Sequence, residues 1–374
     1  MTILNKLNRQ PFNIKLAAVL ISLISIGYLV IQGKELLSPI LFSCLFSILL
    51  LPLARWLQNK CKLSVHAAAM IAVLILVFGI TIIFYFIGSQ VTSLSSDWPL
   101  FKQQLQVSIS KLQEWISVKF HVDQSKQLTY VEATADKLMD SGTVMIGATL
   151  LSLSSMLLFL VFVFIYTFLF LVYRQLIKKF FIAVFREENS GIVLDVIEQV
   201  QYIIRKYIVG LMLEMAIVAC AVSIIFSIMG IKYSILLGII TGLFNLVPYI
   251  GIFTALVISC LITFATSAIA SKVILVVVAL IIVHLIDSNI LLPLIVGSKV
   301  KINALVTVIG VVFGEMIWGI PGMFLSIPVI AVLKIIFDRV ESLKPWGLLL
   351  GDEESKKKTK KVKKVIDKVE EELE

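Results

Sequence analysis

Two long apolar stretches, 234–264 and 302–337, are each interrupted in the middle by glycine, proline and polar residues. Proline has no backbone N–H, and its ring clashes with the preceding helical turn, so it kinks or ends a helix. Inside a bilayer, a backbone group freed by such a break must find a partner in protein or in enclosed water. Paired interruptions of this kind are typical of the binding site of a transporter. The pattern therefore predicts a membrane protein with a polar pathway in its C-terminal third.

The composition agrees with a membrane location. Hydrophobic residues make up 59% of the 374 residues and charged residues only 15%, and a soluble domain could not bury that much apolar surface. Other uncharged runs near the length of a bilayer crossing are 16–33, 36–54, 67–88, 143–173, 215–231 and 273–283, the last of which continues through His284 to about 292. With the two broken stretches, they predict an all-α polytopic membrane protein with about eight membrane-embedded segments.

The charged and amphipathic segments suggest a division of the chain. Residues 89–142 hold an apolar stripe at spacings of three and four, which predicts an amphipathic helix. We divide the chain into three N-terminal transmembrane helices (1–88), an extracytoplasmic amphipathic segment (89–142), a long transmembrane helix (143–173), a cytoplasmic amphipathic linker (174–207), a C-terminal transport block (208–344) and a charged cytoplasmic tail (345–374).

Lysine and arginine near the span ends predict the orientation. Lys6 and Arg9 precede the first run, which has no small-residue cleavage site and is expected to be retained as a span. Basic residues also follow the second and fourth runs, and seven lysines lie in the tail segment 356–364. Both termini are therefore expected in the cytoplasm.

Each broken stretch can either cross the membrane or fold back as a re-entrant hairpin. The halves are about 11–17 residues long, which is mostly short for a crossing of roughly 20 residues. Hairpins would place Lys299 and Lys301 inside and Lys272 outside, and crossings would do the reverse. This favours hairpins slightly, and both arrangements stay open.

Ionisable residues within membrane segments are rare and costly, so each is a candidate site residue. Asp287 and Asn289 lie at the end of the run 273–292, and Glu315 lies in the second break. With Asn245 and Tyr249 in the first break, they form the predicted substrate or ion pathway. An alternative for Asp287 is a helix-end anchor. Glu214 is a weaker candidate, for which a structural partner is equally expected.

Glycines and prolines are predicted to shape the backbone around this pathway. The predicted break and hinge residues are Pro248, Gly251, Pro293, Gly297, Gly319, Pro321, Gly322 and Pro328.

Signatures of catalysis are absent from the sequence. It contains no HExxH, no phosphate-binding P-loop and no GxSxG, and its four cysteines form no CxxC pair. We expect no catalytic residues, no cofactor, no metal site and no nucleic-acid partner. A channel, a membrane scaffold and, less favoured, an intramembrane enzyme are the alternative classes. A channel would give flux without saturation, and a scaffold would bind another protein without transport.

The C-terminal motifs are similar to those of a known family. The runs LGIITGLFNLVPYIGIFTA, HLIDSNILLPLIVGSKVKINALV and GEMIWGIPGMFLSIPVIAVLKIIFD resemble the autoinducer-2 exporter family of bacterial membrane permeases, and the likeness extends over essentially the whole chain. The chain departs from the family pattern at Ile252 and Ala304, where the family carries proline.

The resemblance implies a homo-oligomeric permease of the bacterial plasma membrane that has no ATPase. Members are linked to export of autoinducer-2, and others to sodium or lithium/proton antiport. The expected partners are membrane lipid and either a small polar solute or a monovalent cation or proton. Alternating access of the C-terminal block against an N-terminal scaffold is the expected mechanism.

Overall fold

The computed structural model describes residues 11–96, 156–185, 189–247, 250–267, 270–297 and 302–351, together with the single positions 103 and 107. In these residues the chain is helical, and its only β feature is an isolated antiparallel bridge between Ile302 and Gly351. Seven of the described helices are long and apolar enough to cross a bilayer. The all-α polytopic class predicted from the sequence is confirmed.

Four helices form the N-terminal half. They are α2 (Phe12–Gln32), α3 (Lys34–Lys60), α4 (Val65–Ser96) and a helix over Met156–Val184. A core of small and aliphatic side chains, including Ala54, Ala69 and Leu171, joins α3, α4 and the helix Met156–Val184. Buried Ser43 on α3 also donates a hydrogen bond to the Val163 carbonyl, at 2.9 Å. Apart from positions 103 and 107, the predicted amphipathic stripe of 98–120 lies outside the described residues.

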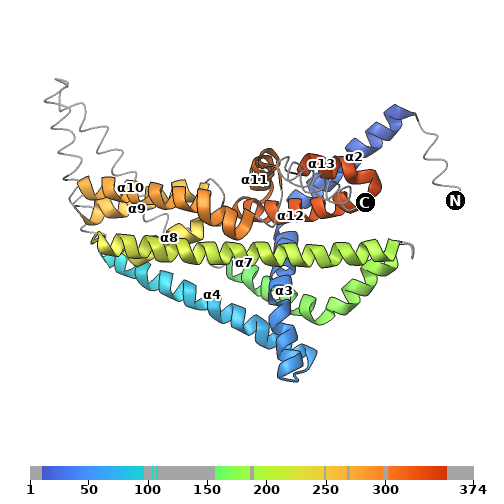
Figure 1. Cartoon of the computed structure of the whole chain (residues 1–374), viewed down its shortest axis with the longest axis horizontal. Helices are drawn as coiled ribbons and strands as arrows, with labels where there is room; N and C mark the ends of the chain where they lie inside the picture. Colours follow the sequence, from blue (N-terminus) through green and yellow to red (C-terminus); the bar gives the residue numbers. More distant parts are fainter. Residues whose placement is uncertain are drawn as a thin grey trace, which may run out of the picture.

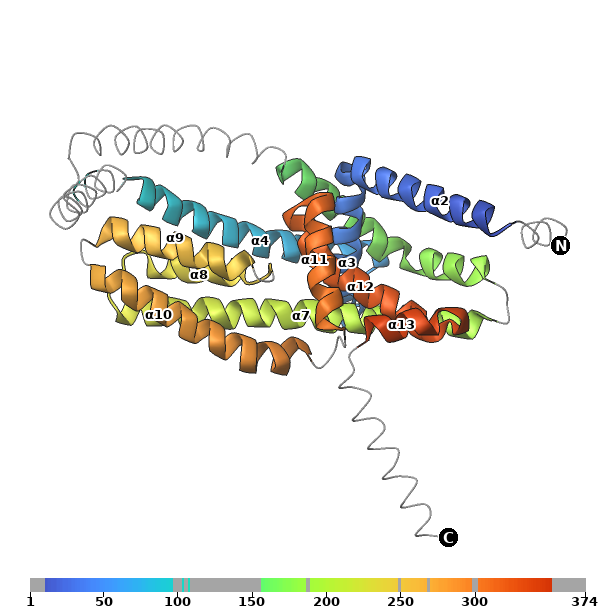
Figure 2. The same cartoon turned by 90° about the horizontal axis from the view of Figure 1, so that it is seen from above.

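The long helix α7 (Ser190–Ile228) organises the molecule. Figure 1 shows it running along the length of the molecule, with α3 crossing it near the middle, and Figure 2 shows the same arrangement from above. It has 39 residues without interruption, so the predicted boundary at 207 between linker and span falls inside one helix. Its contacts extend to α3, α8, α10 and α12.

The first broken stretch forms a helical hairpin. Its arms are α8 (Ser234–Phe244) and α9 (Ile250–Thr266), which pack against each other. The 11 residues of α8 rise about 16 Å at 1.5 Å per residue, about half the thickness of the hydrocarbon core. One arm of this hairpin is therefore too short to cross a bilayer.

The second broken stretch also folds back on itself, through α11 (Ala304–Trp318) and α12 (Ile320–Arg339). Gly319 between them has φ +68° and ψ −144°, a conformation that is essentially restricted to glycine. Gly314 and Gly322 lie against each other across the turn, and a Cβ on Gly322 would be 1.9 Å from the Gly314 carbonyl oxygen. The chain described then ends in a 3-10 turn (Glu341–Leu343) and α13 (Lys344–Leu350), which packs on α12.

The connection between the two hairpins is α10 (Ala270–Ile286), followed by two π-helical turns over Asp287–Leu291 and Pro293–Gly297. Counting each hairpin as one element, the described chain contains eight apolar helical elements; embedding of all eight in the membrane stays a prediction. Large apolar side chains cover much of the outer surface; Phe78 on α4, for example, is 67% exposed. Such a surface suits contact with lipid or with other copies of a membrane protein.

Candidate functional site

Three polar side chains from separate elements meet inside the protein. The side-chain amide of Asn245 donates one hydrogen bond to Glu214 Oε1, at 3.2 Å, and another to Asp287 Oδ2, at 3.1 Å. Glu214 is 2% exposed and Asp287 is 5% exposed. We call these three residues the carboxylate cluster. Two buried acids joined by one neutral amide are costly in a membrane protein, so the arrangement points to a function.

Helix α7 supplies Glu214, and close packing brings α8 against it. Gly238 and Gly242 lie one turn apart on α8, in the small-xxx-small pattern that allows two helices to approach closely. A Cβ on Gly238 would be 2.6 Å from the Ala219 carbonyl oxygen, and a Cβ on Gly242 would be 2.6 Å from that of Met215. Both clashes are with the backbone of α7, so the glycines set the distance between the two helices.

Asn245 reaches Glu214 because α8 ends there. It is the C-cap residue of α8, and its backbone N–H donates to the Thr241 carbonyl at 3.0 Å. Gly251, at the start of α9, closes the hairpin: a Cβ there would be 1.7 Å from the Phe244 carbonyl oxygen. The break therefore places a half-buried polar side chain next to the buried Glu214.

Asp287 is positioned by a change in helical pitch. Helix α10 ends at Ile286, and from Asp287 the backbone is π-helical, with the Leu292 N–H donating to the Asp287 carbonyl five residues earlier. Pro293 cannot donate a hydrogen bond to the preceding turn, which favours such an irregularity. π-helical turns inside α-helices are frequently found at functional sites.

The cluster leaves two oxygens without partners. Glu214 Oε2 and Asp287 Oδ1 are both buried and accept no hydrogen bond. Both carboxylates accept a hydrogen bond from the same amide nitrogen, so they lie close together, and like charges this close repel when both are ionised. One proton or one monovalent cation between them would relieve the repulsion. No group of three or more His, Cys, Asp or Glu side chains suited to a metal ion occurs within the part of the chain that the structure describes.

The second hairpin packs next to the cluster. Trp318 is buried in a core with Tyr207 and Leu211 of α7, and Leu246 from the first break packs against the same core. The indole N–H of Trp318 donates a hydrogen bond to the Val30 carbonyl of α2, at 2.9 Å. The turns of both hairpins therefore contact one region of α7, one turn before Glu214.

The structure brings together some of the predicted pathway residues and separates others. Asn245 and Asp287 meet, and Glu214, the weaker candidate, completes the cluster. Asn289 is exposed, and its amide donates to the Leu285 carbonyl. Glu315 is exposed on α11 and has no hydrogen bond to the cluster. Tyr249, with Pro248, lies outside the described residues.

Within the described chain, most of the predicted backbone residues lie at irregular points, and Pro328 is the exception. Gly251 closes the first hairpin, Pro293 and Gly297 bound the second π-helical turn, and Gly319 forms the second turn. Pro321 and Gly322 lie in the first turn of α12, and Pro328 is buried within that helix. Gly238 and Gly242 were not among the predicted residues, although their spacing of four is visible in the run LGIITGLF.

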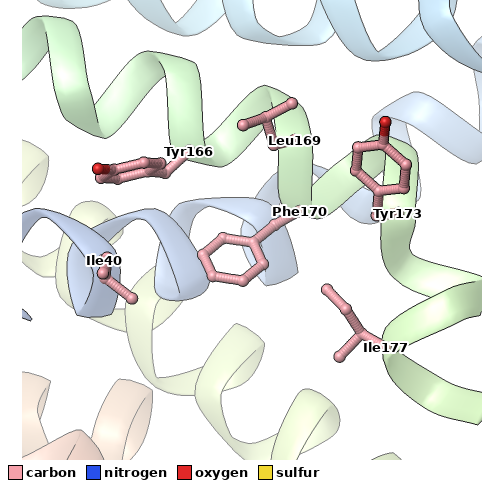
Figure 3. A pocket seen from close by; sticks show the side chains of 6 residues that line it. All are labelled: Ile40, Tyr166, Leu169, Phe170, Tyr173 and Ile177. Atoms are coloured by element: carbon pink, nitrogen blue, oxygen red, sulfur yellow. The ribbon is translucent and has the colours of Figure 1, made fainter. Parts of the chain in front are cut away.

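An apolar cavity of about 290 Å³ lies elsewhere, between α3 and the helix Met156–Val184. Figure 3 shows its lining, which consists of Ile40, Tyr166, Leu169, Phe170, Tyr173 and Ile177. No member of the carboxylate cluster lines it. A hydrophobic groove of this kind suits a hydrocarbon chain better than a polar solute.

Comparison with known proteins identifies the family. The family model described as "AI-2E family transporter" matches residues 16–342. The chain belongs to the AI-2E transporter family. It is 25% identical over 315 residues to the candidate transport protein YueF of Bacillus subtilis (strain 168), covering 81% of this chain and 84% of YueF. It is 22% identical over 339 residues to YhhT of Escherichia coli (strain K12), also named as a candidate transport protein, covering 90% and 93%.

A shorter match has higher identity. The chain is 35% identical over 130 residues to the candidate transport protein YrrI of Bacillus subtilis (strain 168), which is 35% of this chain and 36% of YrrI. The family supports a membrane transport role, and the apolar helices make this AI-2E family member a multi-pass membrane protein.

Proposed function

We propose that this protein is a secondary transporter that moves a small polar solute across the bacterial plasma membrane, with the carboxylate cluster as its polar site. The observation that carries the proposal is the bridging of Glu214 and Asp287 by the Asn245 amide at the break of a hairpin. Interrupted helices that meet near buried polar side chains are the usual site of solute and ion binding in secondary transporters. Autoinducer-2, or a related small molecule, is the solute that the family description suggests.

The two carboxylates favour coupling to a proton or to a monovalent cation such as sodium or lithium. Their unpaired oxygens are buried, and a carboxylate in such a place gains most from a proton or a bound cation. Cation/proton antiport is therefore the second candidate function. It needs only the cluster itself, whereas solute transport needs an additional binding surface.

Alternating access would come from movement of the hairpins against α7. The halves of the second hairpin are joined at Gly319, a glycine at positive φ that can accommodate a large change in backbone angle. We also propose that the assembly is homo-oligomeric and that both termini are cytoplasmic. The exposed apolar surface supports the first, and the basic residues near the span ends support the second.

The test is gradient-driven flux in proteoliposomes, with a panel of small polar solutes and with sodium, lithium and pH gradients. Asp287→Asn and Glu214→Gln are expected to abolish coupling to the cation gradient, because each removes one of the two charges. Glu35→Gln, at an exposed acid in the first turn of α3, is the matched control and is expected to behave like the wild type. Glu315→Gln tests whether the other predicted acid takes part.

Normal gradient-driven flux in both cluster variants would remove the cluster from the mechanism. Flux that neither saturates nor responds to a counter-ion would instead favour a channel. The absence of any flux across the whole panel, combined with capture of another protein, would favour a scaffold.

A further inference from the structure

A second polar region lies where α3, the helix Met156–Val184 and the first half of α7 meet. It is a cavity of about 380 Å³, and its charged lining consists of Arg55, Arg174, Lys178, Arg205 and Glu198. Four cationic side chains against one acidic side chain give the lining a net charge of +3. We call this cavity the basic pocket. It is separate from the carboxylate cluster.

The positive charge of the basic pocket is poorly compensated. Arg55 and Arg205 have no ion pair within the part of the chain that the structure describes. Lys178 is 3.9 Å from Glu198, whose side chain is 71% exposed, so this pair is loose and contributes little. Arg55 and Arg174 are also close enough to repel each other. Converging positive charges of this kind are stabilised by a bound anion.

Arg174 is positioned by two hydrogen bonds and still has an N–H donor without an acceptor. Its guanidinium donates to Gln58 Oε1 at 2.7 Å and to the Leu171 carbonyl at 3.0 Å. Its Nε is buried and has no acceptor, and the same holds for the amide nitrogen of Gln58, which does not line the pocket itself. Buried donors without partners are rare in folded proteins and indicate a missing acceptor. A phosphate offers several strong acceptor oxygens, and the planar arginine fork matches its geometry.

We propose that the basic pocket binds the phosphate of an anionic phospholipid headgroup. The charge of the pocket selects an anion, and its apolar lining on α3, through Ile48, Leu51 and Pro52, suits the glycerol and upper acyl region. The apolar cavity of Figure 3 lies on the same two helices. In each helix most of its residues precede the basic ones in sequence, Ile40 before Arg55 and Tyr166 before Arg174, and Ile177 is the exception. Basic pockets between membrane helices are known headgroup sites.

The test is lipid retention by the full-length protein, measured by native mass spectrometry after exchange into nanodiscs of phosphatidylglycerol or phosphatidylcholine. Phosphatidylglycerol is expected to stay bound and phosphatidylcholine to be lost. The double variant Arg55→Gln/Arg205→Gln should weaken retention of phosphatidylglycerol by about 30-fold, because each cation near a membrane surface strengthens binding by about fivefold. Lys60→Gln/Lys179→Gln is the matched control: it removes two exposed cations from the same region without altering the pocket lining.

A variant that is expected to strengthen lipid retention separates an effect on the pocket from an effect of misfolding. Glu198→Gln removes the one acid from the pocket and should strengthen retention of phosphatidylglycerol, a result that unfolding cannot produce. Equal retention of the two lipids, equal loss in the two double variants, or weaker retention in Glu198→Gln would overturn the proposal. Saturable binding of inorganic phosphate or glycerol phosphate that displaces no lipid would assign the pocket to a soluble anion instead, and would also overturn it.

Discussion

The substitution Gly242→Ala tests whether helix spacing holds the carboxylate cluster together. The added Cβ would be 2.6 Å from the Met215 carbonyl oxygen and 2.8 Å from the Ala219 Cβ. The first of these atoms is backbone, next to Glu214 in the chain, and cannot rotate away. To restore an ordinary contact of at least about 3.4 Å, α8 must move by about 0.8 Å away from α7.

That movement is large enough to break the amide bridge. The bond from Asn245 to Glu214 is already 3.2 Å long, so a comparable shift takes it to about 4 Å, beyond hydrogen-bonding distance. Losing a hydrogen bond to a charged group costs about 1.5–3 kcal/mol, which corresponds to roughly a 10- to 100-fold loss of affinity for an ion held there. Overpacking adds about 1–3 kcal/mol of destabilisation, offset in part by the better helix propensity of alanine.

The assays are thermal unfolding in detergent and gradient-driven flux in proteoliposomes. Gly242→Ala is expected to lower the melting temperature and to reduce flux at limiting ion concentration by at least about tenfold. Gly79→Ala on α4 is the matched control, because a Cβ there meets nothing within 4 Å. It should leave flux unchanged and stability equal or slightly higher. If Gly242→Ala matches this control in both assays, the spacing of α7 and α8 does not govern the site.

Three other substitutions test the frame around the site. Gly319→Ala places a Cβ at φ +68° and is expected to destabilise the second hairpin by about 1–3 kcal/mol in thermal unfolding, whereas Gly88→Ala on α4 should not. Trp318→Phe keeps an aromatic ring in the core but loses the hydrogen bond to the Val30 carbonyl, so it should lower the free energy of unfolding by about 0.5–1.5 kcal/mol. Trp56→Phe, at an exposed tryptophan, is its control. Equal effects of the two substitutions would contradict a stabilising role for the Trp318 hydrogen bond. Asp195→Asn removes an ion pair with Arg339 whose side chains are 53% and 26% exposed, so stability should change by less than about 1 kcal/mol, and a larger loss would show that this contact matters more than its exposure indicates.

Composition and hydropathy were enough to predict the long apolar helices in the part of the chain that the structure describes. Long apolar runs determine which segments enter a membrane, because a charged residue there is costly and a backbone without internal hydrogen bonds is more so. The same argument located the breaks at Asn245 and Gly319, since a glycine or proline in such a run has a strong local effect. Helix ends were less predictable: the helix Met156–Val184 continues past Arg174, where a lysine- and arginine-rich end was expected.

The carboxylate cluster could be predicted only in part. Asp287 and Asn245 stood out as polar residues next to interruptions. Nothing in the sequence states that the π-helical turn after α10 and the end of α8 bring these two side chains within hydrogen-bonding distance. Glu214 was undervalued because it lies in the middle of an uninterrupted helix. Asn289 and Glu315 had the same local signals as Asp287, and the helical phase at each position turned them outward. Long-range contacts, which decide a site, are not contained in local patterns.

The two hairpins share one support, and this limits how the protein can change shape. Because the turns of both rest on the same stretch of α7 around Tyr207 and Leu211, a tilt of that helix shifts both at once. A helix of 39 residues is about 58 Å long, so a small tilt of α7 about one end produces a large displacement of its other end. Opening on one face of the membrane and closing on the opposite face would then be a single mechanical event rather than two independently timed gates.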